Sequence, residues 1–175
     1  VLTSIYAEAR QTQDVDVLIQ VHLTQDTKNH LHKLFQKHKF QPLTNWNDVF
    51  LTWNSNHFIQ ILDPEGIVKL DINIASSNPL SESNYEKIKF LALSNRKRYN
   101  FNGIECWIQG KEDFILSKLV YAGYQDYKDA LACWIRHSQT LNTNYLSKNA
   151  KDLGIDEVYQ ALIRNTAVED VFPDD

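Results

Sequence analysis

The sequence of 175 residues contains no methionine, only two cysteines and no long hydrophobic run. The lack of methionine predicts that the natural chain starts before Val1. Cys106 and Cys133 are too few to hold a small secreted fold together, so we expect buried thiols in a reducing cytoplasm. No stretch approaches about 18 consecutive apolar residues, and no signal peptide begins the chain, which predicts that it has no membrane-spanning segment.

An excess of positive charge is also missing, because 18 Lys and Arg stand against 22 Asp and Glu. Residues 1–100 hold 11 basic and 10 acidic side chains, whereas residues 101–175 hold 7 and 12. This balance argues against a general affinity for DNA or RNA. The hydrophobic fraction of 43% and the charged fraction of 23% are those of a globular protein. The length suits one domain, or one domain with a helical appendage.

Asp14 and Asp16 stand two residues apart at the start of an apolar, β-branched run that extends to Val21. Side chains at i and i+2 of a strand point to the same side, so we expect the two carboxylates to project together. Two adjacent like charges cost free energy unless a cation lies between them. Mg²⁺ prefers one or two carboxylates together with phosphates. The pair indicates a metal–phosphate site, although a solvated turn before an ordinary strand also accounts for it.

Asp71 lies within a second alternating run, residues 66–74. One face of this run carries Val68, Leu70, Ile72 and Ile74, and the other carries Lys69, Asp71 and Asn73. An acidic residue flanked by apolar ones in mid-strand needs a partner. If this strand lies beside the first, Asp71 joins Asp14 and Asp16. Three carboxylates around metal can activate a hydroxyl and clamp a triphosphate for in-line phosphoryl transfer.

These residues resemble a known family. The segment Thr3–Asp16, TSIYAEARQTQDVD, is similar to the active-site signature of the minimal nucleotidyltransferases of the DNA polymerase β superfamily, which include bacterial MNT and AbiEii-type toxin–antitoxin proteins. The likeness continues in Lys69–Asp71, which matches the strand of the third carboxylate. It also covers WIQGKEDFILSKL at residues 107–119, which resembles a strand–turn–helix, and the Asp-x-x-Asp of residues 126–129.

The resemblance implies a cytoplasmic, Mg²⁺-dependent nucleotidyltransferase. Such an enzyme transfers a nucleoside monophosphate from a nucleoside triphosphate (NTP) to a hydroxyl of a protein or a tRNA, and a toxin–antitoxin system with a cognate toxin as partner is one setting. Asp14, Asp16 and Asp71 would hold one or two Mg²⁺ ions and carry catalysis. The residues that the resemblance implies for nucleotide binding are Ser4, Arg10, Thr12 and Lys118.

A catalytically silent member of the same fold is the alternative. Ala7 and Ala9 stand where the family usually has Gly and Pro, and the family's Gly-Ser would fall before Val1. Such a protein would act as an antitoxin-like binding module or as a nucleotide sensor that binds without turnover.

The order of strand-like runs followed by helical runs predicts an α/β (α+β) fold with a sheet core, flanking helices and a C-terminal helical bundle. The resemblance implies that this core is a mixed sheet of the nucleotidyltransferase type. The predicted regions are a sheet core at 1–109, a helical region at 110–168 and a frayed acidic tail at 169–175. Strand-like runs occur at 49–53 and 57–62, and the second leads through the turn Asp63–Gly66 into the Asp71 strand.

Two further features leave alternatives open, and a third is a helix cap. The basic run Arg96–Arg98 suits a triphosphate or an RNA backbone, or it is a solubilising loop. Lys118 lies on the flank of an apolar helical stripe, where it faces the nucleotide by resemblance or is a surface lysine. We expect Asp126 to cap the next helix, with Asp129 in its first turn.

Overall fold

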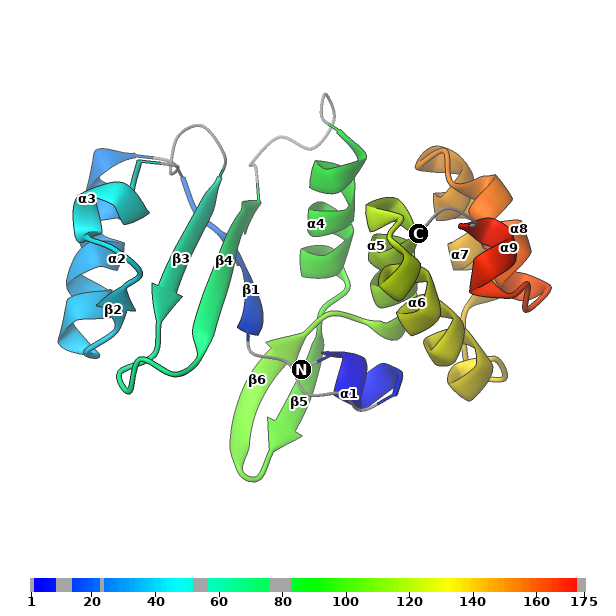
Figure 1. The fold of residues 1–175 in the computed structure, drawn as a ribbon, viewed down its shortest axis with the longest axis horizontal. Coiled ribbons are helices and arrows are strands. Elements are labelled where there is room, and N and C mark those ends of the chain that lie inside the picture. Colours follow the sequence, from blue (N-terminus) through cyan, green and yellow to red (C-terminus); the bar gives the residue numbers. More distant parts are fainter. Residues whose placement is uncertain (1, 9–13, 23, 52–56, 76–82, 173–175) are drawn as a thin grey trace. The chain divides into compact units, whose positions relative to one another are not determined.

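The computed structural model describes residues 2–8, 14–22, 24–51, 57–75 and 83–172. It confirms a mixed fold in which helices accompany a four-stranded mixed sheet and a two-stranded antiparallel sheet (Figure 1). The described helices are α1 (Leu2–Tyr6), α2 (Gln25–Lys37), α3 (Trp46–Val49), α4 (Asn84–Ser94), α5 (Lys111–Tyr121), α6 (Tyr124–His137), α7 (Thr143–Asp152), α8 (Asp156–Ile163) and α9 (Val168–Val171). The described strands are β1 (Asp14–Gln20), β2 (Gln41–Pro42), β3 (Phe58–Leu62), β4 (Lys69–Ala75), β5 (Lys97–Phe101) and β6 (Ile104–Ile108).

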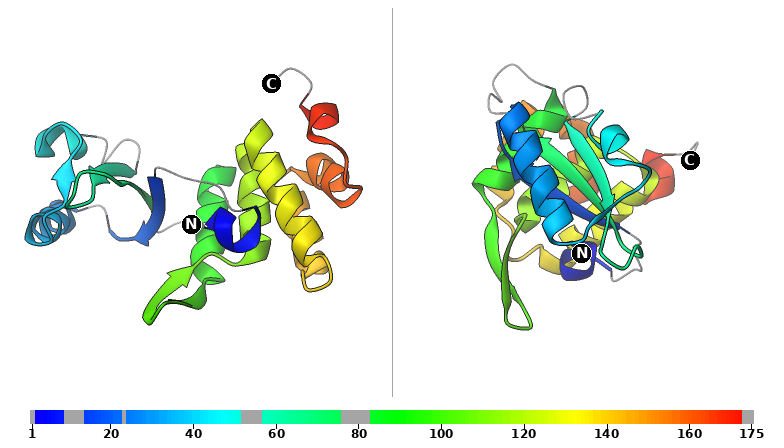
Figure 2. Two further views of the ribbon diagram at one scale, coloured as in Figure 1. Left: turned by 60° about the horizontal axis from the view of Figure 1, so that its bottom comes forward. Right: turned by 90° about the vertical axis from the view of Figure 1, so that its left-hand side faces the viewer.

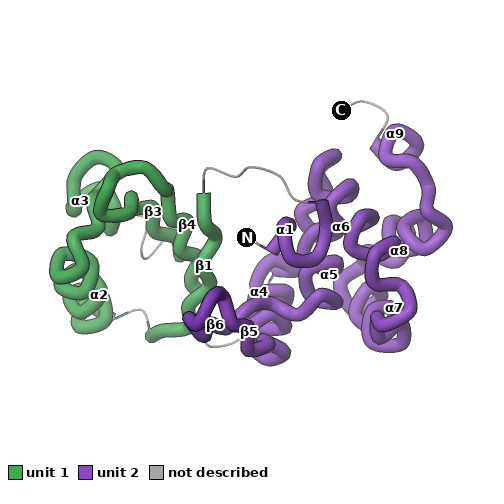
Figure 3. Tube along the Cα trace, turned by 90° about the horizontal axis from the view of Figure 1, so that it is seen from below, with its two compact units in different colours: residues 1, 11–79 green, residues 2–10, 80–175 purple. Residues whose placement is uncertain are grey.

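The chain forms two compact units (Figure 3). One, which we name the sheet unit, comprises residues 11–79 together with residue 1, and the other, the helical unit, comprises residues 2–10 and 80–175. This division falls at other places than the predicted ranges 1–109 and 110–168. The short helix α1 packs with the helical unit although it precedes β1 in the sequence.

The sheet unit is built on strands in the order β1-β4-β3-β2. β1 runs parallel to β4, and β3 runs antiparallel to both β4 and β2. The predicted turn joins β3 to β4, and the Asp63 carboxylate accepts hydrogen bonds from the backbone N–H groups of Ile67 and Val68. Gly66 closes this turn with φ 72°, a left-handed conformation that favours glycine.

One face of this sheet is buried beneath α2 and α3. Alternation along β3 and β4 points their isoleucines into the core on this face. The buried core residues are Phe35, Val49, Phe50, Ile59, Ile61, Ile72 and Ile74. The prediction of a strand at 49–53 is wrong for residues 49–51, because Val49 ends α3 and Phe50 and Leu51 form a turn. Residues 52 and 53 lie outside the described residues. The Asn45 side chain accepts a hydrogen bond from the Asp48 N–H, and this cap starts a helical turn in an otherwise strand-like run.

The helical unit has a separate core. Its fully buried residues come from α5 and the helices that follow, and include Ile115, Leu116, Ala130, Cys133, Leu146 and Leu162. The predicted cap at Asp126 is wrong, because α6 begins after Gly123 and places Asp126 in its first turn. The predicted fraying of residues 169–175 is wrong for 169–172, since α9 covers 168–171 and Phe172 packs against Tyr127. Residues 173–175 lie outside the described residues.

Strands β5 and β6 form a hairpin that projects from the helices of its own unit (Figure 2). Its turn contains Asn102 and Gly103, with Gly103 at φ 92°. Of the basic run Arg96–Arg98, for which a solubilising loop was one alternative, Arg96 precedes β5, and Lys97 and Arg98 are its first two residues. Among the described residues, no helix is both long enough and apolar enough to cross a membrane.

Candidate functional site

The three predicted catalytic carboxylates lie on two adjacent strands of the sheet unit. In the parallel pairing of β1 with β4, Asp16 is opposite Asp71 and Asp14 is opposite Lys69. Residues that are paired in this way, and residues two apart on one strand, point to the same side of the sheet. The structure therefore brings Asp14, Asp16 and Asp71 onto one face, opposite the face that α2 and α3 cover. We call these residues, with Lys69, the carboxylate cluster.

Lys69 joins two of the carboxylates. Its Nζ lies 2.9 Å from Asp71 Oδ2 and 3.8 Å from Asp14 Oδ2. On the other side of Asp71, Gln60 donates a hydrogen bond from Nε2 to Oδ1 over 3.0 Å, because β3 pairs Gln60 with Asp71. Both oxygens of Asp71 thus have a partner, and its side chain is only 14% exposed. These contacts hold the Asp71 carboxylate in a fixed orientation.

The electrostatics of the cluster favour a cation. The hydrogen bond to Asp71 raises the pKa of Lys69 above its ordinary value, and the charges of Asp71, Asp14 and Asp16 add to this against the opposing effect of desolvation. Three carboxylates and one ammonium leave a formal charge of −2 on this part of the sheet. A second cation would therefore be attracted to the same face.

The cluster does not have the arrangement of a finished metal site. In the described ranges, no group of three or more His, Cys, Asp or Glu side chains is placed to hold a metal ion. The donor chemistry fits Mg²⁺, since carboxylate oxygens are its usual protein ligands. Lys69, however, holds one oxygen each of Asp71 and Asp14, so a metal ion would have to displace its ammonium group.

Of the four predicted nucleotide-binding residues, two are described by the structure and two are not. Arg10 and Thr12 lie outside the described residues. Ser4 is exposed on α1, and Lys118 lies on α5, so both belong to the helical unit. The carboxylate cluster itself belongs to the sheet unit.

Lys118 has two carboxylate partners on α6. Its Nζ lies 2.6 Å from Asp126 Oδ1 and 3.1 Å from Asp129 Oδ2. Burial lowers the pKa of Lys118, but hydrogen bonds to Asp126 and Asp129 outweigh it, and the pKa lies above its ordinary value. The Asp-x-x-Asp segment noted in the sequence thus supplies both partners, which tie α6 to α5. Gln125 also donates a hydrogen bond to Asp129.

Sequence reasoning did not identify Gln60, which donates a hydrogen bond to Asp71 of the carboxylate cluster. It placed Lys69 on the correct face but gave it no role. Counting back from the turn at Asp63 pairs Leu62 with Lys69 and then Gln60 with Asp71. The length of the turn was therefore the signal for Gln60. Asp14 is the second partner of Lys69 because of the register between β1 and β4. A pattern within one strand carries no information about that register.

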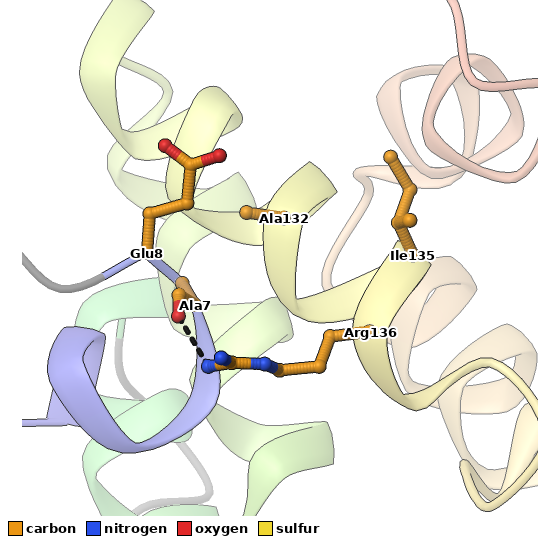
Figure 4. Close-up of a pocket in the computed structure, with 5 residues that line it drawn as sticks. All are labelled: Ala7, Glu8, Ala132, Ile135 and Arg136. Atoms are coloured by element: carbon orange, nitrogen blue, oxygen red, sulfur yellow. Dashed lines mark hydrogen bonds between the residues drawn. The ribbon is translucent and has the colours of Figure 1, made fainter.

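A pocket of about 300 Å³ lies in the helical unit between the end of α1 and α6 (Figure 4). Its lining residues are Ala7, Glu8, Ala132, Ile135 and Arg136. The Arg136 guanidinium donates a hydrogen bond to the Ala7 carbonyl, whereas the Glu8 carboxylate points away from it (Figure 4). Because its cation is engaged with the backbone, we assign no chemistry to this pocket.

Comparison with known proteins adds no relative. The chain matches no protein-family model, and it matches no curated protein. The geometry of the described residues therefore carries the functional argument.

Proposed function

We propose that the sheet unit catalyses Mg²⁺-dependent nucleotidyl transfer, in which a nucleoside monophosphate passes from an NTP to a hydroxyl of a protein or a tRNA. The single observation that carries this proposal is the register of Asp16 with Asp71, with Asp14 two residues away on the same face. Three carboxylates on one face keep a formal charge of −2 after pairing with Lys69, and this excess of like charge is unfavourable unless a further cation binds. The three carboxylates form the arrangement that phosphoryl transfer needs, because the reaction depends mainly on positioning and charge stabilisation.

The residues that would hold Mg²⁺ are Asp14, Asp16 and Asp71. The ion would supply neutralisation of the negative charge on the triphosphate. The formal charge of −2 on the cluster supports binding of a divalent cation even while Lys69 is present. Once displaced, the Lys69 ammonium would remain two residues from Asp71 on the same face, where it suits an anionic phosphate oxygen.

Asp71 is the proposed general base. The acceptor hydroxyl gives its proton to the Asp71 carboxylate while its oxygen forms a bond to the α-phosphorus of the NTP. The bond from that phosphorus to the oxygen bridging to the β-phosphate breaks, pyrophosphate leaves, and the proton passes from Asp71 to water. Gln60 fixes the carboxylate by its hydrogen bond to Oδ1, so the base is oriented before the acceptor arrives.

The test is a metal titration of the full chain, read at single residues. We expect Mn²⁺ to broaden the backbone amide NMR signals of β1 and β4 around Asp16 and Asp71, and Mg²⁺ to compete with it. Asp71→Asn should abolish this broadening, while Glu65→Gln, an exposed change of equal charge in the turn of the same unit, should leave it intact. Broadening that is equal in both variants would place the metal elsewhere and overturn the proposal.

The NTP is tested by thermal unfolding with Mg²⁺ and each NTP. A ligand at about 100 times its dissociation constant stabilises the folded state by roughly 2.7 kcal/mol. We expect stabilisation by at least one NTP that is lost in the Asp14→Asn/Asp16→Asn variant and kept in Glu65→Gln. Release of pyrophosphate when candidate acceptors are added then separates turnover from binding.

The second candidate is the catalytically silent module, antitoxin-like or nucleotide-sensing. The observation that favours it is the ion pair of Lys69 with Asp71 and Asp14, because a permanent ammonium would replace the metal. This candidate predicts no Mn²⁺ broadening at β1 and β4. A nucleotide sensor would still be stabilised by an NTP, whereas an antitoxin-like module would respond only to a protein partner.

A further inference from the structure

The hairpin β5–β6 carries a group of cationic and aromatic side chains that the proposed transfer does not use. Antiparallel pairing places Arg98 opposite Trp107 on one face of the hairpin. The guanidinium carbons of Arg96 and Arg98 lie 4.9 Å and 5.1 Å from the centroid of the Trp107 ring. We call these three residues the Arg–Trp face.

The Arg–Trp face is open in the described structure. Trp107 is 55% exposed, and the Arg98 side chain is 70% exposed. A large aromatic ring at such exposure on a projecting hairpin leaves apolar surface in water. This exposed surface does not stabilise the monomer, and such surfaces often mark binding sites. Ile104 and Tyr99 on the opposite face of the hairpin are exposed as well.

The charges of the hairpin are predominantly positive. Residues 96–108 hold three cations, at positions 96, 97 and 98, against the single carboxylate of Glu105. Arg98 lies 3.9 Å from Glu105, a distance at which the two are an ion pair without a hydrogen bond. Arg96 donates one hydrogen bond from Nη1 to the Leu93 carbonyl. Its remaining N–H groups and those of Arg98 are the donors that a phosphate can reach, because a guanidinium over an aromatic ring keeps its N–H groups in the plane. The acidic total of the chain therefore hides a local cationic site.

We propose that the Arg–Trp face binds single-stranded nucleic acid, with phosphates at Arg96 and Arg98 and an unpaired base stacked on Trp107. Aromatic rings between cationic side chains bind unstacked bases without regard to sequence, and the arginines neutralise the backbone. A duplex offers no free base face to the ring, so the chemistry favours a single strand. The site lies in the helical unit and is independent of the carboxylate cluster and of nucleotidyl transfer.

The experiment measures fluorescence anisotropy of the full chain with labelled 12-nucleotide oligo(U), oligo(dT) of equal length, a DNA duplex and a polyglutamate peptide. We expect the single strands to bind, and the duplex and the peptide to bind weakly or not at all. Preference for RNA over DNA, or the reverse, identifies the natural source of the strand. Oligo(U) binding should weaken with salt, with a slope in log–log form of about −0.7 for each phosphate contact.

Three variants locate the site. Arg96→Gln/Arg98→Gln should weaken oligo(U) binding roughly tenfold or more. It should also make the log–log salt slope less steep by the amount that two phosphate contacts contribute. Trp107→Ala should also weaken it by roughly tenfold, whereas Trp107→Phe retains stacking. Lys148→Gln/Lys151→Gln removes the same charge from exposed positions of α7 in the same unit and should change nothing beyond the weak effect of net charge.

Equal loss of binding in the α7 control and the arginine variant would overturn the proposal, because it would show attraction by net charge alone. Failure of the wild type to bind either single strand at 50 mM salt would overturn it too, and tighter binding of polyglutamate would assign the face to an acidic protein. If circular dichroism shows that Trp107→Ala is not folded, the arginine variant alone decides whether the Arg–Trp face binds the strand. Mn²⁺ broadening at β1 and β4 is measured separately, so failure here leaves the proposed function standing.

Discussion

Lys118 allows a sharp test of a structural role against a nucleotide-binding role. Its side chain is 17% exposed, and its partner Asp129 is 5% exposed, so replacement by Met leaves a buried carboxylate without its cation. Removal of one member of a buried ion pair costs about 3–5 kcal/mol. The hydrogen bond from Gln125 to Asp129 and the partial exposure of Asp126 reduce this, and we expect about 2–3 kcal/mol.

The assay is thermal unfolding of the full chain, followed by circular dichroism. Lys118→Met should lower the Tm of the helical unit by roughly 9–14 °C. Lys148→Met, a control at an exposed position of α7, should change stability by less than about 0.5 kcal/mol. Adding Asp126→Asn and Asp129→Asn to Lys118→Met should restore part of the loss, because no buried charge then remains unpaired.

An unchanged Tm in Lys118→Met would refute the structural reasoning. If the same variant also lost stabilisation by Mg²⁺ and NTP, the lysine would have the nucleotide-binding role that the family resemblance implies. A lower Tm with full NTP stabilisation assigns Lys118 to the contact between α5 and α6 alone.

Two further predictions concern other charged residues. Burial raises the pKa of the Asp113 carboxyl, and this effect outweighs the hydrogen bond that the carboxylate accepts from Tyr145. The group therefore contributes stability that is fully present below the unfolded pKa of about 3.9. This contribution is lost as pH rises through the folded pKa. Asp113→Asn should therefore gain in Tm relative to wild type between about pH 4 and pH 7, and a constant difference across that range would contradict this. Lys69→Met should raise the affinity of the cluster for Mg²⁺ by roughly tenfold, measured by competition with Mn²⁺, because it removes a positive charge beside the ion; weaker binding would mean that the ammonium organises the site rather than occupying it.

Local patterns in the sequence were enough to predict the acidic face of the sheet. Alternation placed Asp14 with Asp16 and Lys69 with Asp71, and the turn at Asp63 predicted the hairpin that carries β4. The same period-two reasoning failed at 49–51, because one capping side chain, Asn45, outweighed the strand propensity of the residues after it. Propensity is a weak signal over so short a segment.

Long-range contacts were beyond such patterns. The pairing of Lys118 with Asp126 and Asp129 depends on the angle between two helices. From the sequence, Lys118 was either a nucleotide-facing lysine, by resemblance, or a surface lysine, and Asp126 was expected to cap a helix. The membership of α1 in the helical unit depends on Tyr6, which donates a hydrogen bond to the Gln109 carbonyl, and on Arg136, which donates to the Ala7 carbonyl. Neither partner is near α1 in sequence.

The place of α1 has a consequence for synthesis of the protein on the ribosome. This helix is made before every other described element, yet the hydrogen bond from Arg136 to Ala7 spans 129 residues. At roughly 5–20 residues per second, α1 waits about 6–26 s for that partner. The strands β1 and β4 emerge well within this interval, so the sheet unit can complete its pairing while α1 still lacks its helical partners. Holding α1 in place, for example by attaching it to a support, would consequently delay folding of the helical unit. It would not delay the sheet unit, although β1 directly follows α1 in the chain.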